Sequence, residues 1–377
     1  MDHAADTGAG RSEGADVRQI DLSNIEELAR GCAVLGTGGG GETRTAAAAV
    51  RHAIREHGPV EVIGIDDLSP EDVIMPLSGV GAPTVSAEMM PGLGEAARLR
   101  DAAEEIMGRA VAAVMASEIG GGNGVMPAAW AAQLGLPLVD ADGMGRAFPE
   151  LPMVSMYVAG VPVRPMAMTD VYGNVSIVRA TDAASSERIG RAICVAGGCH
   201  VLMSDYLMTA AEAASAVVHG TISKAVELGN LLLTSPDPIG RLAARMNGRV
   251  LMTGKIVDVE RRITGGFTRG YVSVSGAGMD DGRSMRIEVQ NEFLVALEQN
   301  EVRACVPDSI VLVHAETGEA VATENVRYGQ RVTILAWPSV PIWRTDRGLQ
   351  VAGPGAFGYE FGFVPVEQRV EGIHTPV

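Results

Sequence analysis

The sequence predicts an α/β fold: an N-terminal α/β domain with a largely parallel sheet, followed by a helical segment and a β-rich C-terminal domain. Two observations lead to this prediction. Between residues 60 and 145, short apolar runs alternate with helical stretches, which is typical of a parallel sheet covered by helices. From residue 249 on, β-rich stretches follow one another with glycines between them, which is typical of a small barrel or sandwich.

The domain boundaries follow from where these patterns change. At 377 residues the chain suits two domains. Residues 1–19 have no apolar core like that of a signal peptide, and we expect a disordered leader there. We expect the N-terminal α/β domain over residues 20–182. The C-terminal domain is expected over 183–377, helical over 183–248 and β-rich over 249–377.

The individual elements are predicted from apolar periodicity and from turn residues. In the first domain, helices are expected at about 24–34, 45–56, 95–108 and 126–135. Strands are expected within 60–68, 71–81, 110–118, 136–145, 152–160, 162–170 and 175–180. In the second domain, helical runs are expected within 184–198, 207–220, 221–233 and 237–248. Strands are expected there within 250–263, 267–276, 285–298, 308–318 and 330–338, and the tail at 353–370 should fold back onto the body.

Composition excludes several classes of function. The net charge of −16, without a basic cluster, argues against nucleic-acid binding and against an anionic membrane surface. The chain has no apolar run of about 18 residues that could span a membrane. Its four cysteines, Cys32, Cys194, Cys199 and Cys305, form no CxxC motif and suit buried thiols in a reducing compartment. We therefore expect a cytoplasmic protein.

The glycine-rich stretch GTGGGGET, at residues 36–43, is a candidate binding loop. It lacks the Lys-Ser/Thr pair of a P-loop, and it follows a helical pattern where a dinucleotide fingerprint would follow a strand. Its bare backbone N–H groups could bind an anion or the polar edge of a ligand. The substrate-binding candidates here are Thr37, Gly38, Gly39, Gly40 and Gly41. A glycine-rich turn without a ligand is the alternative.

Acidic residues that end apolar runs are the catalytic candidates. Glu118 closes one such run, and Asp140 and Asp142 close another, so all three should lie at the carboxyl edge of a parallel sheet. Carboxyl groups close together in an apolar crevice can act as general acid and base. Asn123 would orient an amide-like ring and stabilise developing charge, and Glu88 follows another strand end and could join the same crevice. Alternatively, Asp142 makes a turn and Asp140 caps the next element.

Further substrate-binding candidates lie elsewhere in the chain. Arg146 could bind a substrate carboxylate through two parallel hydrogen bonds, or it could pair with Glu150. In the β-rich third, Asn291 and Glu292 stand out as polar residues within an apolar run. Phe267 follows a glycine pair and completes the set.

Several of these motifs together resemble one protein family. The motifs are VLGTGGGGE, APTVSAE, SEIGGGNGVMP, PLVDADGMGRAFPELPM, GKIVDVERRITGGFTRG, QNEFLVA, VPDSI and GPGAFGYE. They are similar to those of the S-methyl-thiohydantoin desulfurase family over nearly all of the chain, from about Ile20 to Tyr359. The sequence departs from that family's pattern at His314 and at Cys199-His200.

The resemblance implies a hydrolase that removes sulfur from an S-methyl-thiohydantoin or a related cyclic amide ring and yields a hydantoin. It also implies association with hydantoinase/oxoprolinase-type enzymes, and a non-catalytic accessory subunit of such an enzyme is the alternative function. No cofactor is certain; carboxylates with an asparagine leave room for a divalent metal, whereas the sequence has no His-rich zinc signature. We expect a homo-oligomer as well.

Overall fold

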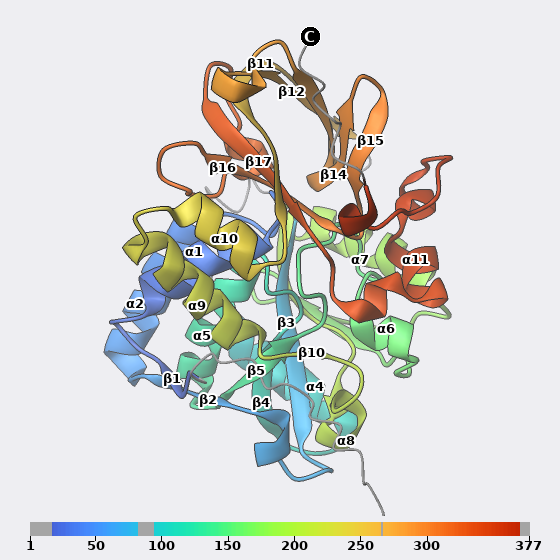
Figure 1. The fold of residues 1–377 in the computed structure, drawn as a ribbon. Coiled ribbons are helices and arrows are strands. Elements are labelled where there is room, and N and C mark those ends of the chain that lie inside the picture. Colours follow the sequence, from blue (N-terminus) through green and yellow to red (C-terminus); the bar gives the residue numbers. More distant parts are fainter. Residues whose placement is uncertain (1–16, 82–93, 265–266, 370–377) are drawn as a thin grey trace, which may run out of the picture.

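The protein was analysed as a computed structural model, which describes residues 17–81, 94–264 and 267–369. Figure 1 shows an α/β part at the bottom of the view and a β-rich part at the top, in orange and red. The described residues include no helix long and apolar enough to cross a membrane. This arrangement agrees in outline with the predicted α/β fold and β-rich final third.

The first sheet is mixed, which corrects the prediction of a largely parallel one. Its ten strands run in the order β1-β2-β5-β4-β3-β8-β6-β7, with β10 paired to β5 and β9 to β3. Among the strands that the structure describes, only the neighbours β2, β5, β4 and β3 pair in parallel. The strands are β1 Gln19–Ile20, β2 Val60–Ile63, β3 Val73–Gly81, β4 Val111–Ala116, β5 Leu138–Asp142, β6 Met166–Thr169, β7 Val175–Val178, β8 His200–Ser204, β9 Met208–Thr209 and β10 Val218–His219.

The long strand β3 explains this mixed pairing. Its C-terminal half pairs antiparallel with β8, and its start pairs antiparallel with β9. Both partners come from the segment 183–248, which the sequence predicts to be helical. Strands of two residues, such as β9 and β10, are too short to show a period of two, so they escape a prediction based on periodicity.

Side chains of the central strands alternate between two cores. Val73 and Met75 of β3 pack on the side of helices α1, α2, α5 and α9, whereas Ile74 packs on the opposite side. This alternation is the normal consequence of the strand period. The α-helices within the described residues are α1 Ile25–Leu35, α2 Thr43–His57, α4 Glu95–Met107, α5 Gly121–Leu134, α6 Ser155–Ala159, α7 Ala183–Ala196, α8 Ala210–Ala213, α9 Thr221–Thr234, α10 Pro238–Arg245 and α11 Asp346–Ala352.

Helix α5 lies at the centre of the helical layer. It packs against α1, α2 and the sheet, and most of its residues are buried. Alanines and glycines on nearly every side allow this close approach to its neighbours. The helix begins at Gly121, five residues before the predicted start, because its first turn is formed by glycines that the sequence alone marks as loop.

The second sheet is antiparallel and curled. Its seven strands run in the order β15-β14-β13-β12-β11-β17-β16, and β14 and β15 lie near β16. The strands are β11 Arg249–Thr264, β12 Phe267–Gly276, β13 Ser284–Gln290, β14 Glu292–Glu298, β15 Glu301–Cys305, β16 Ser309–His314 and β17 Arg331–Trp337. The predicted single stretch 285–298 is a hairpin, because Asn291 turns the chain with a φ of 56°.

Two further predictions of local structure were wrong. The expected strand at 152–160 contains the short helix α6, because its apolar residues pack into one core from a single helical turn. The expected helical run at 207–220 contains β9, the four-residue helix α8 and β10. The tail does fold back onto the body, where the backbone N–H of Val366 donates to Asp308.

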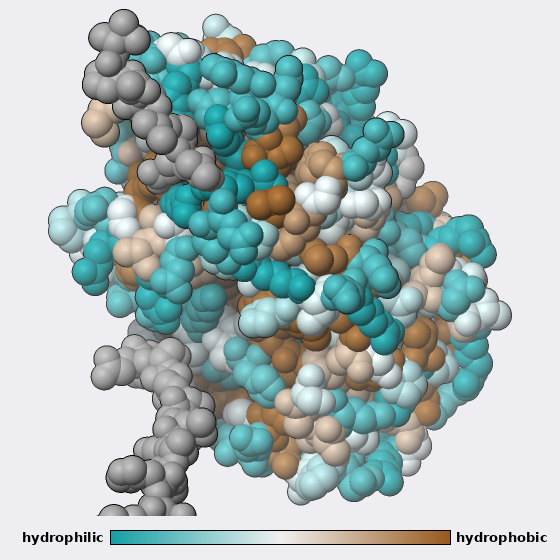
Figure 2. Space-filling view, turned by 45° about the vertical axis from the view of Figure 1, so that its right-hand side comes forward, coloured by the Kyte–Doolittle hydropathy of each residue, from teal (hydrophilic) through white to brown (hydrophobic). Residues whose placement is uncertain are grey.

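Hydrophilic residues cover most of the face shown in Figure 2, with hydrophobic residues interspersed near its middle and lower part. The largest exposed hydrophobic side chains belong to separate elements, for example Tyr172, Val195, Met279 and Tyr328. The predicted homo-oligomer remains a prediction, which size-exclusion chromatography with light scattering tests directly.

Candidate active site

A cavity of about 190 Å³ lies at the carboxyl ends of β3 and β4. This is far more room than the roughly 10–15 Å³ that one water requires. Its walls come from the glycine loop, β3, the start of α5, the loop before α6, β8, and the β-rich part around residues 291–292 and 323–324. Met126, Trp130 and Phe148 contribute apolar surface. An apolar body with a few polar groups is typical of a small-molecule site.

Unpaired buried polar atoms gather around this cavity. Ten buried side-chain oxygen or nitrogen atoms in the described part of the chain have no hydrogen-bond partner, and six of them belong to residues that line the cavity. These six are Ser117 Oγ, Glu118 Oε2, His200 Nδ1, Asp205 Oδ1, Glu292 Oε2 and Glu324 Oε1. Buried polar groups are nearly always paired, so this concentration indicates a place where a ligand supplies the partners.

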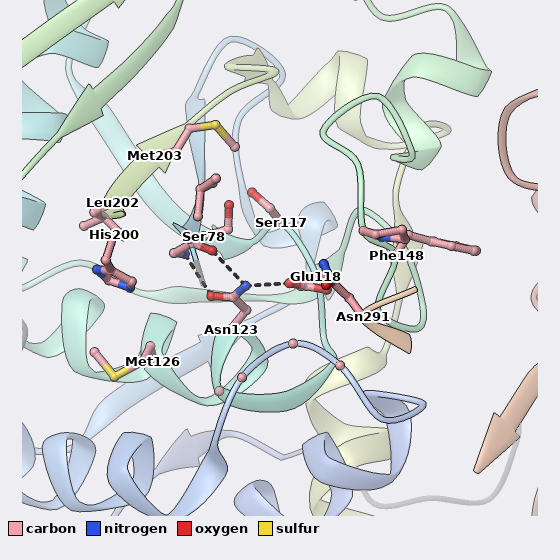
Figure 3. Close-up of a pocket in the computed structure, with 18 of the residues that line it drawn as sticks. Ser78, Ser117, Glu118, Asn123, Met126, Phe148, His200, Leu202, Met203 and Asn291 are labelled. Atoms are coloured by element: carbon pink, nitrogen blue, oxygen red, sulfur yellow. Dashed lines mark hydrogen bonds between the residues drawn. The ribbon is translucent and has the colours of Figure 1, made fainter. Parts of the chain in front are cut away.

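Asn123 holds Glu118 in place. The side-chain Oδ1 of Asn123 accepts a hydrogen bond from the backbone N–H of Gly79 at 2.8 Å, and its Nδ2 donates to the carbonyl of Gly79 at 3.1 Å. The same Nδ2 donates to Glu118 Oε1 at 2.5 Å. Figure 3 shows Asn123 between His200 and Glu118, with these bonds dashed. Asn123 is thus a positioning residue, because its amide groups contact protein atoms.

Glu118 and Glu292 are two buried carboxyl groups that influence each other. They are only 7% and 2% exposed. Burial raises the pKa of Glu118 to about 8, the hydrogen bond from Asn123 lowers it, and the charge of Asp142 raises it. Burial also raises the pKa of Glu292 well above its ordinary value, and the charge of Glu118 adds to this. Both shifts favour the protonated carboxyl groups near neutral pH, so the pair can supply an acid, and the member that loses its proton supplies a base.

Asp142 lies behind the cavity and supports its wall. Its carboxylate accepts hydrogen bonds from the backbone N–H groups of Ile119, Met144 and Gly145 at 2.8–3.0 Å. Burial raises the pKa of Asp142 to about 7, although these backbone donors lower it. The side chain is fully buried and does not line the cavity. Its contacts give it a structural role: it fastens the loop after β5 to the residue that follows Glu118.

Asp140 lies away from the cavity. Its carboxylate accepts from the backbone N–H of Ile222 at 2.8 Å and of Ser223 at 3.0 Å, and from the Ser223 hydroxyl at 2.6 Å. These donors belong to the first turn of α9, where N–H groups have no partner within the helix. Asp140 therefore caps α9, the structural alternative that the sequence left open. The structure brings Glu118 and the glycine loop together at the cavity, but it does not bring Asp140 there.

The glycine loop has two parts with different contacts. Thr37 and Gly38 face the β-rich part, because the Thr37 carbonyl accepts from the N–H of Phe293 and the Gly38 carbonyl from that of Thr323. Neither residue lines the cavity. A Cβ on Gly38 would come within 2.6 Å of the Phe293 ring, so the glycine allows this close approach.

Gly39, Gly40 and Gly41 do line the cavity. The carbonyls of Gly40 and Gly41 accept from Asn123 and Gly122 at 3.0 Å. Among the described residues, the N–H groups of Gly40 and Gly41 have no hydrogen-bond partner. Both residues have positive φ, 79° and 87°, which glycine adopts without strain. These two N–H groups could bind an oxygen or sulfur atom of a ligand.

Arg146 does not line the cavity, and its guanidinium is occupied by the protein. Its Nη1 donates to the carbonyls of Pro307 and Asp308, its Nη2 to Thr37 Oγ1, and its Nε to the carbonyl of Ala147. The side chain is 1% exposed. These contacts join the loop after β5 to the β-rich part, and they leave no fork of donors for a substrate carboxylate. The alternative partner from the sequence, Glu150, does not bind Arg146 either.

Of the remaining substrate-binding candidates from the sequence, one lines the cavity, one does not, and one lies outside the described residues. Asn291 lines the cavity, and its Oδ1 accepts from the N–H of Thr268 at 2.9 Å. Phe267 does not line it; Arg191 and Arg269 stack on its ring, at 4.9 and 5.9 Å from its centre. Glu88 lies outside the described residues.

Sequence reasoning missed several lining residues. His200, Asp205 and Glu324 were not candidates, although each has an unpaired buried atom at the cavity. Burial lowers the pKa of His200, so its imidazole is neutral, whereas burial raises the pKa of Asp205 to about 7. The antiparallel pairing of β8 with β3 brings the first two to the cavity. The signal for this strand in the sequence is the short apolar run VLM at residues 201–203, shortly before Asp205.

A divalent metal was left open by the sequence. Within the described ranges, no group of three or more His, Cys, Asp or Glu side chains is placed to hold a metal ion.

Comparison with protein families matches both halves of the chain. The model of the S-Me-THD-like N-terminal domain matches residues 23–180, and that of the S-Me-THD-like C-terminal domain matches residues 180–366. The chain belongs to the S-Me-THD-like family. This confirms the resemblance found in the sequence. The S-Me-THD-like halves meet at the cavity, because its wall includes Glu118 from the first half and Glu292 from the second.

The comparison with solved structures shows a shared fold and does not bear on function. A crystal structure of a protein from Chromobacterium violaceum is similar with a TM-score of 0.76 and 24% identity, covering 93% of this chain and 100% of that one. No curated protein matches the chain. The S-Me-THD-like fold is therefore shared with a solved structure at low sequence identity.

Proposed function

We propose that this protein is a hydrolase that removes the methylthio group from an S-methyl-thiohydantoin or a related cyclic amide ring and yields a hydantoin. The observation that supports it best is the cavity where buried, unpaired polar atoms surround the interacting carboxyl groups of Glu118 and Glu292. Family membership supports the thiohydantoin-like ring as the substrate class.

The reaction needs one water and no other co-reactant. Water attacks the ring carbon that carries the methylthio group and forms a new C–O bond. The C–S bond then breaks, and the sulfur leaves as methanethiol after it takes up a proton. The ring carbon becomes a carbonyl, so one water is consumed for each hydantoin and each thiol produced.

The carboxyl pair supplies the proton transfers. One member of the pair Glu118 and Glu292 accepts a proton from the attacking water, and the protonated member donates to the leaving sulfur or the ring nitrogen. Asn123 keeps the Glu118 carboxyl in a fixed orientation. The free N–H groups of Gly40 and Gly41 stabilise negative charge that develops on the ring. This assignment replaces Asp140 and Asp142, whose oxygens accept from backbone N–H groups elsewhere.

Release of methanethiol tests the proposal. Purified protein is incubated with unsubstituted S-methyl-thiohydantoin and with its propionate and aminoalkyl derivatives, with and without added divalent metal, and thiol is measured in the headspace. We expect Glu118→Gln and Glu292→Gln to reduce turnover by a factor of about 10² or more. Glu316→Gln, at an exposed glutamate outside the cavity lining, is the matched control. Absence of thiol release from every ring by the wild-type protein contradicts the proposal.

The accessory-subunit alternative predicts a different result. If Glu118→Gln leaves function in cells intact while a hydantoinase/oxoprolinase-type protein still co-purifies, the chain serves as a binding subunit. Association with such a partner remains a prediction, and the same co-purification measures it.

A further inference from the structure

The two carboxyl groups of the pair Glu118 and Glu292 have different surroundings. The Nδ2 of Asn123 donates a hydrogen bond to Glu118 Oε1 at 2.5 Å, and Glu118 Oε2 is buried without a partner. Within the described residues, no other residue donates to the carboxyl group of Glu292, and its Oε2 is also without a partner. A hydrogen-bond donor favours the ionised form of a carboxyl group, so the protein stabilises a carboxylate at Glu118 more than at Glu292.

The orientation of Asn123 makes this donor permanent. Its Oδ1 accepts a hydrogen bond from the backbone N–H of Gly79 at 2.8 Å, a contact that requires an acceptor. Turning the amide over would place Nδ2 against that N–H and Oδ1 against Glu118, so both hydrogen bonds would be lost. Asn123 therefore always presents a donor to Glu118 Oε1, as Figure 3 shows, and Oε2 is the oxygen left to take up a proton.

The groups around Glu118 act on it in both directions. Burial raises its pKa to about 8, and the charge of Asp142 raises it as well. The hydrogen bond from Asn123, the backbone N–H of Phe148 and the charge of Arg146 lower it. The hydrogen-bond donors thus offset part of the cost of a buried carboxylate at this position.

Glu292 lacks such a donor from another residue. Burial raises its pKa well above the ordinary value, the charge of Glu118 raises it further, and the charges of Arg146 and Arg191 lower it. Arg146 acts on both members of the pair, so its charge does not distinguish them. Once Glu118 is ionised, its negative charge keeps the proton on Glu292.

We propose that the two groups have fixed roles in the reaction: the carboxylate of Glu118 activates the attacking water through Oε2, and the carboxylic acid of Glu292 protonates the leaving sulfur. This assignment rests on the proposed function and specifies how the substrate lies in the cavity. The water lies on the side of Glu118 and Asn123, and the methylthio group lies against the β-rich part, near Glu292 and Asn291.

The proton transfers form a closed cycle. The oxygen of water bonds to the ring carbon, one proton of the water passes to Glu118, and an electron pair of the ring C=N bond moves to the nitrogen. This pair forms the C=N bond again as the C–S bond breaks, and the sulfur takes the proton of Glu292. Glu118 then gives its proton to the ring nitrogen while Glu292 takes the hydroxyl proton. The products are a hydantoin and methanethiol, and both groups are restored.

Two leaving groups of similar size test the assignment. The substrates are S-ethyl- and S-trifluoroethyl-thiohydantoin; the fluorines stabilise the departing thiolate, which then needs less help from a proton donor. We expect Glu292→Gln to slow thiol release from the S-ethyl ring by a factor of about 10² or more, and to raise the ratio of trifluoroethyl to ethyl rates at least about tenfold above that of wild type. Glu118→Gln should slow both rings alike and leave the ratio within about threefold of wild type. Glu292→Asp, whose carboxyl group is withdrawn by one methylene, should shift the ratio in the same direction as Glu292→Gln.

The pH dependence gives a second readout. Because Glu118 acts as a carboxylate, turnover should rise with pH through about 8, and Glu118→Gln should lack this limb. Glu316→Gln, at the exposed glutamate outside the cavity lining, should change neither the ratio nor the profile. A raised leaving-group ratio in Glu118→Gln, or in neither variant, overturns the assignment, while thiol release by wild type still supports the proposed function. Absence of thiol release from every ring by the wild-type protein overturns both.

Discussion

Asn123→Ala is the most informative single substitution, because one side chain makes three of the contacts that build the site. It removes the two hydrogen bonds that tie α5 to Gly79 of β3, and the one that orients Glu118. A typical hydrogen bond contributes about 1 kcal/mol of net stability. The three bonds together therefore correspond to a loss of about 3 kcal/mol in the free energy of unfolding.

Thermal unfolding measures this loss. With an unfolding entropy of about 2.1 cal/mol/K per residue, 1 kcal/mol lowers the Tm of this 377-residue chain by roughly 1.3 °C, so the variant should melt about 4 °C below wild type. The matched control is Asn230→Ala, an exposed asparagine in α9 whose side chain makes no hydrogen bond among the described residues. It should melt within about 2 °C of wild type, since surface substitutions rarely exceed 0.5 kcal/mol.

The same variant tests the role of Asn123 in orienting Glu118. Loss of the donor to Oε1 removes a contribution that lowers the pKa of Glu118, so this pKa should rise further in the variant. The acidic or basic limb of the pH–rate profile that depends on Glu118 should move to higher pH in the fraction that remains folded. A melting temperature within 2 °C of wild type, together with an unchanged pH profile, would refute the assigned contacts.

Three further substitutions probe other parts of the site. Burial raises the pKa of Glu118 to about 8, so its contribution to the free energy of unfolding is fully present below about pH 4.5 and is lost as pH rises toward 8. Glu118→Gln does not titrate, so its Tm relative to that of wild type should increase from pH 5 to pH 8. A Cβ at Gly39 would lie 2.0 Å from an oxygen of Glu292, so Gly39→Ala should reduce turnover at least about tenfold, whereas Gly355→Ala, with open space around it, should not. Arg146→Ala leaves buried carbonyls unpaired and should cost about 3 kcal/mol or more in chemical denaturation, and an altered KM with normal stability would contradict its structural role.

Local signals in the sequence predicted part of the site. Glu118 follows a continuous apolar run, and Gly39–Gly41 are conspicuous by composition, so both were found before the fold was known. Helices α1, α2 and α4 and the parallel strands were predicted within a few residues, because each has a clear period or an apolar run bounded by turns.

The rest depends on contacts between distant residues. Asp140 and Asp142 have the same local pattern as Glu118, yet the N–H groups that occupy Asp140 come from α9, about 80 residues later. His200 and Asp205 reach the cavity through the pairing of β8 with β3, which no local period reveals. In the sequence Arg146 resembles an anion-binding residue, but in the structure its guanidinium donates to the backbone carbonyls of Pro307 and Asp308. Chemical type is visible in a sequence, whereas the partner that occupies a group is decided by tertiary packing.

Neither family domain of this chain encloses the cavity by itself. Glu118 and the glycines come from residues 23–180, and His200, Asp205 and Glu292 come from residues 180–366. A ligand in the cavity touches both halves at once and so acts as a cross-link between them, without any covalent bond. Saturating ligand should therefore protect the chain against proteases that cut near residue 180, and two separately expressed halves should bind each other more tightly when ligand is present.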